Sequence, residues 1–290
     1  MGRRDDAGEA LHAIARQILT RAGHAIEDRS LSEAVAVHEF RKVMKRWRAL
    51  LRLLEPYLGR GGRKLRAEAR DLARALSGPR DAQSAIDAFD DTFRHNTKIS
   101  QRSLASVRTR LEEARRKSES TVLTEEMRSK IETALRAAAR ATRQWRRRRI
   151  VADDISEQLS ESYRRTRRRI PDDWEHAAPE DLHRLRQRVI ELRYQLELVE
   201  PIFPNIGKPR INELQKLRDR LGRYQDLVLL GNLTGPKGLL APWRGRLAPY
   251  IADRQAVHLA AAARLSERLF ADRPKAIRRR LHEIRAAASN

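Results

Sequence analysis

The two halves of this 290-residue sequence match each other at a constant offset of 145 residues. Residues 37–41, with the sequence VHEFR, align with residues 182–186, with the sequence LHRLR. Other matching pairs are Arg48 with Arg193, Glu55-Pro56 with Glu200-Pro201, and Leu72, Leu76 and Asp81 with Leu217, Leu221 and Asp226. A match over half a chain indicates duplication of one structural unit. We therefore predict internal repeats at approximately residues 6–145 and 151–287, within a single domain that spans residues 1–290.

Apolar residues recur three and four positions apart along most of the chain, as in Leu11, Ile14, Ala15 and Ile18. This spacing is typical of amphipathic helices. Gly and Pro are concentrated in short segments, which mark helix ends. The predicted breaks lie at residues 56–62, 77–79, 118–124, 171–179, 201–209, 231–242 and 272–274. Since no run shows the alternation of a strand, we predict an all-α protein with roughly four helices in each repeat.

Positive charge constrains the partners of the protein. The chain has 62 Lys and Arg against 39 Asp and Glu, a formal net charge of +23. A surface of this charge attracts polyanions and repels copies of itself. The absence of cysteine excludes disulfides, thiolate metal sites and a cysteine nucleophile. No signal peptide or long apolar run is present, so we expect a soluble cytoplasmic protein that does not enter a membrane.

A column of cations follows one face of the helix predicted around residue 45. At about 100° per residue, His38, Arg41, Lys45, Arg48 and Arg52 lie within an arc of roughly 80°. The column contains almost no acid, whereas a solvated helix face usually mixes both signs. A solvated face remains the alternative interpretation. The candidate binding residues of the first repeat are His38, Arg41, Lys42, Lys45, Arg48 and Arg52.

The second repeat carries a weaker version of this column. Its candidate binding residues are His183, Arg186 and Arg193. Ile190 stands at the position of Lys45, and Glu191 stands at the position of Arg46. Arginine forks bind phosphate oxygens in pairs, and lysine acts as a point charge. A row of such residues suits a chain of phosphates, and we expect the first repeat to dominate binding.

These motifs resemble those of the CHAD family, the conserved-histidine α-helical domain. The resemblance rests on His38-x-x-Arg41, Lys45-Arg46-x-Arg48 and Leu76-x-x-x-Arg80-Asp81, and on His183-x-x-Arg186, Leu192-Arg193-Tyr194 and Leu221-Gly222-x-x-x-Asp226. The resemblance covers nearly the whole chain. Gln225 departs from the family pattern, since the first half has Arg80 at the matching position. The resemblance implies two four-helix bundles packed with pseudo-twofold symmetry around a basic groove or pore. It also implies binding of inorganic polyphosphate and, as in some bacterial members, association with polyphosphate granules.

Nucleic acid is the alternative partner, because net charge alone would favour it. Aromatic residues make up only 5% of the chain, and those near the column lie on the opposite side, whereas single-strand binders stack bases on exposed aromatics. The sequence has no helix–turn–helix or zinc-finger pattern. It also has no Gly-rich phosphate loop, no nucleophile elbow and no convincing acidic cluster for Mg²⁺. We therefore predict a binding protein that is not an enzyme and needs no cofactor. The oligomeric state is left open.

Four further residues carry structural predictions. Trp47 and Tyr57 lie on the apolar side of their segments and are predicted to be core residues. Asp81 and Asp226 are predicted to cap helix starts, because an acid there accepts hydrogen bonds from free amides. No two of the eight histidines lie within five residues of each other, so no metal site is predicted.

Overall fold

The structure is a computed structural model that describes residues 7–76, 80–94, 98–118, 123–147, 150–203 and 207–289. The described residues form eleven α-helices and no β-sheet, which confirms the all-α prediction. The first half contains α1 (Ala7–Glu27), α2 (Glu33–Leu53), α3 (Glu55–Ala75), α4 (Arg80–Phe93), α5 (Gln101–Ser118) and α6 (Glu125–Arg143). The second half contains α7 (Ala152–Arg167), α8 (Pro179–Leu198), α9 (Lys208–Leu233), α10 (Arg244–Leu269) and α11 (Pro274–Ser289). None of these helices is long and apolar enough to span a bilayer.

Helices of the two halves correspond at the same offset of 145 residues. Shifted by this offset, α1 and α2 fall on α7 and α8, and α5 and α6 fall on α10 and α11. The exception is the α3–α4 pair, which falls on the single helix α9. The described residues thus form six α-helices in the first half and five in the second, where the sequence predicted roughly four in each.

The continuity of α9 corrects one prediction. Asp226 does not cap a helix start, because α9 runs without interruption from Lys208 to Leu233. The first half has Pro79 two residues before Asp81, whereas the matching position in the second half is Tyr224. A proline lacks the amide hydrogen that a helix interior needs, so only the first half carries this break signal. Residues 77–79 and the side chain of Asp81 lie outside the described part of the chain.

The two aromatic predictions have different outcomes. Trp47 is a core residue as predicted, since it is 2% exposed. It stacks on Trp145 with ring centroids 5.7 Å apart. Tyr57 is only half-buried and packs against the outside of the core. Burial and the neighbouring charge of Asp154 raise the pKa of its phenol to about 12. Within the predicted break at 56–62, α3 kinks at Gly59, whose φ of 56° favours glycine.

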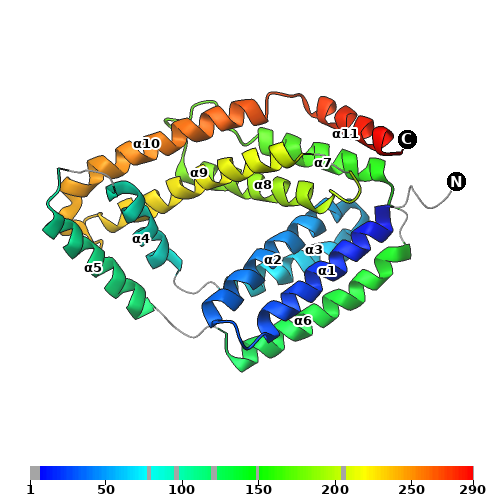
Figure 1. Ribbon diagram of the computed structural model, residues 1–290, viewed down its shortest axis with the longest axis horizontal. Coiled ribbons are helices and arrows are strands. Elements are labelled where there is room, and N and C mark those ends of the chain that lie inside the picture. Colours follow the sequence, from blue (N-terminus) through cyan, green and yellow to red (C-terminus); the bar gives the residue numbers. More distant parts are fainter. Residues whose placement is uncertain are drawn as a thin grey trace.

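Apolar side chains form two separate clusters. The larger cluster joins α1, α2, α3 and α6 to α7, α8, α11, the start of α9 and the end of α10. We call this part the main lobe. The smaller cluster joins α4 and α5 to the end of α9 and the start of α10, and we call this part the distal lobe. Figure 1 shows α4 and α5 at the left end of the molecule, away from α1 and α6.

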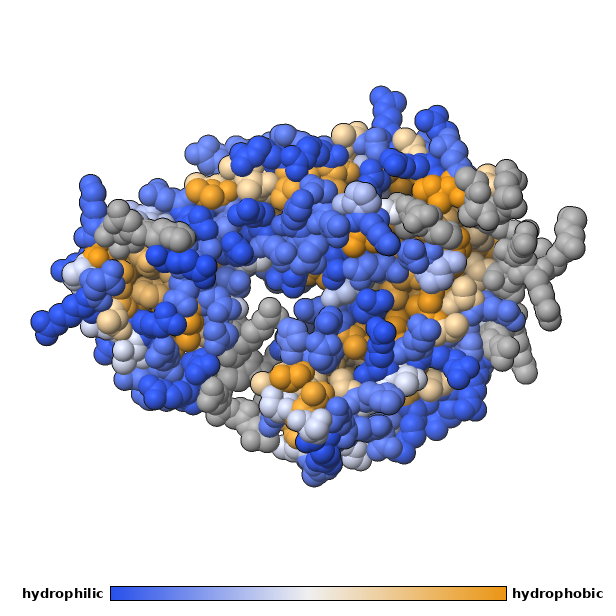
Figure 2. Space-filling view, viewed as in Figure 1, coloured by the Kyte–Doolittle hydropathy of each residue, from blue (hydrophilic) through white to orange (hydrophobic). Residues whose placement is uncertain are grey.

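In the main lobe, the halves meet where α2 contacts α8. There Gln195, which is fully buried, donates a hydrogen bond from Nε2 to the carbonyl of Ala49 at 3.3 Å. Figure 2 shows the molecule hollowed where the distal lobe, the α8–α9 layer and α2 come together, and polar residues border this hollow. The fold therefore places α2, which carries the cation column, beside an open space between the lobes.

Candidate functional site

The cation column of α2 lies between α3 and α8. Phe40 and Trp47 on the opposite side of α2 are buried in the main lobe, which turns the column away from the core. Arg41 reaches α3, because its Nη1 lies 3.5 Å from the carbonyl oxygen of Leu76. Arg52 faces α8, where its Nε lies 4.0 Å from Oε1 of Glu191. Two neighbouring helices therefore form walls beside the column.

One of these walls contributes a second row of arginines. Arg66, Arg70 and Arg74 of α3 are close enough to Arg48 for their positive charges to act on it. Burial lowers the pKa of Arg48, and these three charges lower it further, while Glu191 opposes them. Arginine stays protonated in proteins, so Arg48 carries its charge at a partly buried position near three other cations. This row was not among the residues predicted from the sequence, although its four-residue spacing is that of one helix face.

Among the described residues, Arg48 has no ion pair of its own. Its Nε is buried without a hydrogen-bond partner, and within the described part of the chain no carboxylate lies at ion-pair distance from it. A buried cation of this kind is costly unless an anion approaches it. We use the name basic cluster for Arg48, Arg52, Arg66, Arg70, Arg74 and Arg188, which the electrostatic contacts of Arg48 and Arg66 connect.

Two partly buried carboxylates lie inside the basic cluster. Glu55 of α3 accepts from Nη1 of Arg52 at 2.8 Å and lies 3.4 Å from Nη1 of Arg66. Glu191 of α8 accepts from Nη1 of Arg188 at 3.1 Å. Burial lowers the pKa of Arg66, and the charge of Arg52 acts in the same direction. The cations therefore remain in excess in a partly desolvated space, where an added anion would be attracted strongly.

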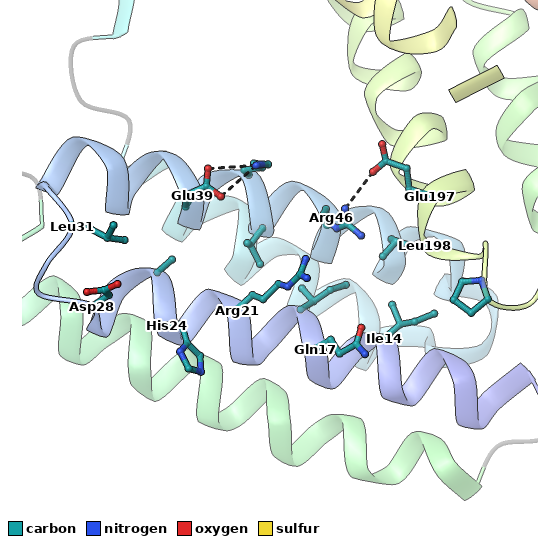
Figure 3. Close-up of a pocket in the computed structure, with 15 residues that line it drawn as sticks. Ile14, Gln17, Arg21, His24, Asp28, Leu31, Glu39, Arg46, Glu197 and Leu198 are labelled. Atoms are coloured by element: carbon teal, nitrogen blue, oxygen red, sulfur yellow. Dashed lines mark hydrogen bonds and ion pairs between the residues drawn. The ribbon is translucent and has the colours of Figure 1, made fainter. Parts of the chain in front are cut away.

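Lys42, a candidate binding residue outside the cation column, lies on a different surface of α2. Its Nζ lies 3.4 Å from the carboxylate of Glu39, and both residues line a pocket of about 420 Å³ between α1, α2 and the end of α8. Figure 3 shows this pocket, with Arg46 bound to Glu197 at 3.3 Å on one wall. Arg21 also lines it, whereas no arginine of the basic cluster does. His38 is exposed and Lys45 is half-buried.

The candidate residues of the second half are largely neutralised or held by neighbours. His183 is exposed and lies 2.7 Å from the amide nitrogen of Gln187. Nη1 of Arg186 donates to Oε1 of Gln225 on α9 at 3.2 Å. Arg193 forms an ion pair with Glu197, and its guanidinium lies over the ring of Tyr194. Arg193 is thus compensated, whereas Arg48, which it matches in the first half, is not.

A model of the CHAD domain family matches residues 9–234 of the chain. The chain belongs to the CHAD family. It is similar to a CHAD domain from the plant Ricinus communis, known from a crystal structure, with 20% sequence identity and a TM-score of 0.59. The similarity covers 96% of this chain and 92% of that one, and at such low identity it concerns the fold alone. A comparison with curated proteins finds no match.

The histidines and the arginines of the motifs differ in their surroundings. His38 and His183 are both exposed, so neither histidine is fixed by the core. In the portion of the chain that the structure describes, no group of three or more His, Asp or Glu side chains could hold a metal ion. The uncompensated charge in this portion lies instead on Arg48, since Arg66 and Arg70 of α3 have Glu55 and Asp71 beside them at 3.4 and 2.9 Å.

Proposed function

We propose that this CHAD domain binds inorganic polyphosphate at the basic cluster, in a groove between its two halves. The observation that carries the proposal is Arg48, a half-buried arginine that faces three more arginines and has no carboxylate at ion-pair distance among the described residues. The proposal includes a pseudo-twofold relation between the halves, in which α2 and α8 occupy equivalent positions. The groove then runs past both columns, and the first half supplies most of the binding.

Polyphosphate is complementary to the basic cluster in charge, and its regularly spaced phosphates suit the regular spacing of the arginines. Arg66, Arg70 and Arg74 are about one helical turn apart, so their side chains are spaced by roughly 5–6 Å along α3. Each guanidinium can donate two hydrogen bonds to oxygens of one phosphate. Partial burial removes competing water and strengthens these contacts. A flexible chain of phosphates can therefore satisfy several arginines at once.

Nucleic acid fits the same region less well. The aromatic residues of the two column helices, Phe40, Trp47 and Tyr194, are buried and offer no exposed ring for base stacking. We propose a binding protein and not a polyphosphate hydrolase, and association with polyphosphate granules would follow from binding. Release of orthophosphate from polyphosphate in the presence of Mg²⁺ or Mn²⁺ would contradict the proposal that the protein binds polyphosphate without hydrolysing it.

Binding of long-chain polyphosphate is expected to weaken steeply with salt. If the cluster makes about four phosphate contacts, a plot of log affinity against log salt concentration should have a slope of about −3, by analogy with single-stranded nucleic acid. Fluorescence titration between low and moderate salt measures this slope. Competition at equal phosphate concentration is the control: duplex DNA and RNA should displace polyphosphate poorly. Equal displacement by nucleic acid would overturn the proposal.

A further inference from the structure

Glu191 is one of the two partly buried carboxylates inside the basic cluster. It lies on α8, and its Oε1 is 3.1 Å from Nη1 of Arg188 and 4.0 Å from Nε of Arg52. Its negative charge also acts on Arg48 and Arg66. Its side chain is 24% exposed, so solvent still reaches it. One carboxylate therefore faces four arginines from three helices.

Glu191 has the opposite charge to the matching residue of the first half. The matching residue in the first half is Arg46, which binds Glu197 of α8 on the far side of α2. A cation at position 191 would face Arg52 and Arg188 and would be repelled by both. The second half thus carries an acid where its counterpart carries a base, and this acid points into the cluster.

The contacts of Glu191 are weaker than those that a phosphate could make. A separation of 4.0 Å between Arg52 Nε and Glu191 Oε1 is too long for a hydrogen bond, and Arg52 Nε is buried without a hydrogen-bond partner. A phosphate group has more acceptor oxygens and can bind an arginine fork in pairs. It would therefore satisfy Arg52 and Arg188 better than Glu191 does.

We propose that Glu191 is an internal counter-ion that compensates the empty basic cluster and is displaced from Arg52 and Arg188 when polyphosphate binds. This inference rests on the proposed function. Glu191 lowers the affinity for polyphosphate, because each binding event must first break its ion pairs. It also reduces the number of small ions released on binding, and hence the salt dependence.

The test replaces the carboxylate with the amide of the same shape, as Glu191→Gln. We expect the affinity for long-chain polyphosphate to rise roughly three- to tenfold, the range of a partly exposed ion pair, and the salt slope to become steeper. The free variant should melt at a lower temperature than the wild type, because the arginines repel one another. Polyphosphate should raise its melting temperature more than it raises that of the wild type.

Glu125→Gln is the matched control. Glu125 pairs with Arg29 at an exposed position, so this variant makes the same change in net charge outside the basic cluster, and its affinity should stay within about twofold of the wild type. Glu191→Ala serves as a second variant and should shift affinity in the same direction as Glu191→Gln. Equal or weaker binding by both Glu191 variants, with wild-type binding intact, would overturn this inference alone. Failure of the wild type to bind polyphosphate would overturn the proposed function itself.

Discussion

Replacement of Arg48 by glutamate is expected to lower the affinity for polyphosphate by about 100-fold or more, since a single charge-assisted contact is worth about 1.5–3 kcal/mol and a new carboxylate would also repel phosphate. The variant should remain folded. At position 48 a glutamate would face Arg66, Arg70 and Arg74 and would compensate their charges. Isothermal titration with long-chain polyphosphate measures the affinity, and a thermal melt measures the stability.

Two comparisons make the Arg48 result specific. Arg140→Glu reverses a charge on the exposed face of α6 and should change the affinity less than fivefold, because solvent screens a distant surface charge. Arg193→Ala should cost less affinity than Arg48→Ala, since Glu197 already compensates Arg193. Similar losses for Arg48→Glu and Arg140→Glu would mean that binding depends on overall charge, and the proposed site would then be wrong.

Much of the fold could be predicted because helix periodicity and internal duplication are local patterns in the sequence. The offset of 145 residues places α7, α8, α10 and α11 correctly from the first half. The same reasoning failed at Asp226, because the offset transferred a helix start from a segment with Pro79 to one without a proline. Similarity between repeats therefore predicts the positions of helices better than it predicts where they are interrupted.

The division of each half between two lobes could not be predicted. Periodicity shows that a helix has an apolar face, but it does not show which other helix covers that face. The distal lobe combines α4 and α5 with the end of α9 and the start of α10, through Phe93, Leu111, Leu227 and Leu247 among others. These contacts join segments more than a hundred residues apart, so no local pattern reports them.

The candidate site was predicted in part. The helical spacing of about 100° per residue correctly placed Arg48 and Arg52 on one face of α2. The structure brings both residues into the basic cluster. Lys42 is rotated by about 100° from Arg41 around the helix, and it accordingly lies in the pocket between α1 and α2. The arginines of α3 were missed because a row of charges on one helix becomes a binding wall only when another helix packs beside it.

Asp91 is the central polar residue of the distal lobe. This residue of α4 accepts two hydrogen bonds from Arg254 of α10, at 2.8 and 2.9 Å. It lies 2.9 Å from Nε2 of His258, which is fully buried, and 3.4 Å from Nη1 of Arg223 on α9. Nδ1 of the same histidine lies 3.4 Å from Nη1 of Arg220. One carboxylate thus connects α4 to α9 and α10, the two helices that extend from the main lobe into the distal lobe.

Removal of this carboxylate by Asp91→Ala is expected to destabilise the distal lobe by about 2–4 kcal/mol, because Arg254 and His258 would lose their shared acceptor in a partly buried site. Hydrogen exchange should show lower protection in α4, α5 and the start of α10, with α1 and α2 unchanged, since the lobes have separate apolar clusters. The control is Asp87→Ala, one turn earlier on α4, where an exposed aspartate accepts a hydrogen bond from Gln83. Uniform loss of protection across both lobes would contradict their independence.

The pH dependence of this stabilisation has a definite sign. The hydrogen bonds from Arg254 hold the pKa of Asp91 well below its usual range, and the bond from His258 adds to this effect. A carboxylate whose pKa is lower in the folded state stabilises the fold above its unfolded pKa of about 4, and this contribution is lost as the pH falls further. The difference in stability between the wild type and Asp91→Ala should therefore decrease as the pH falls from about 4 toward 2. Denaturant melts across this range measure it, and a difference that persisted undiminished at pH 2 would show that Asp91 acts through packing and not through its charge.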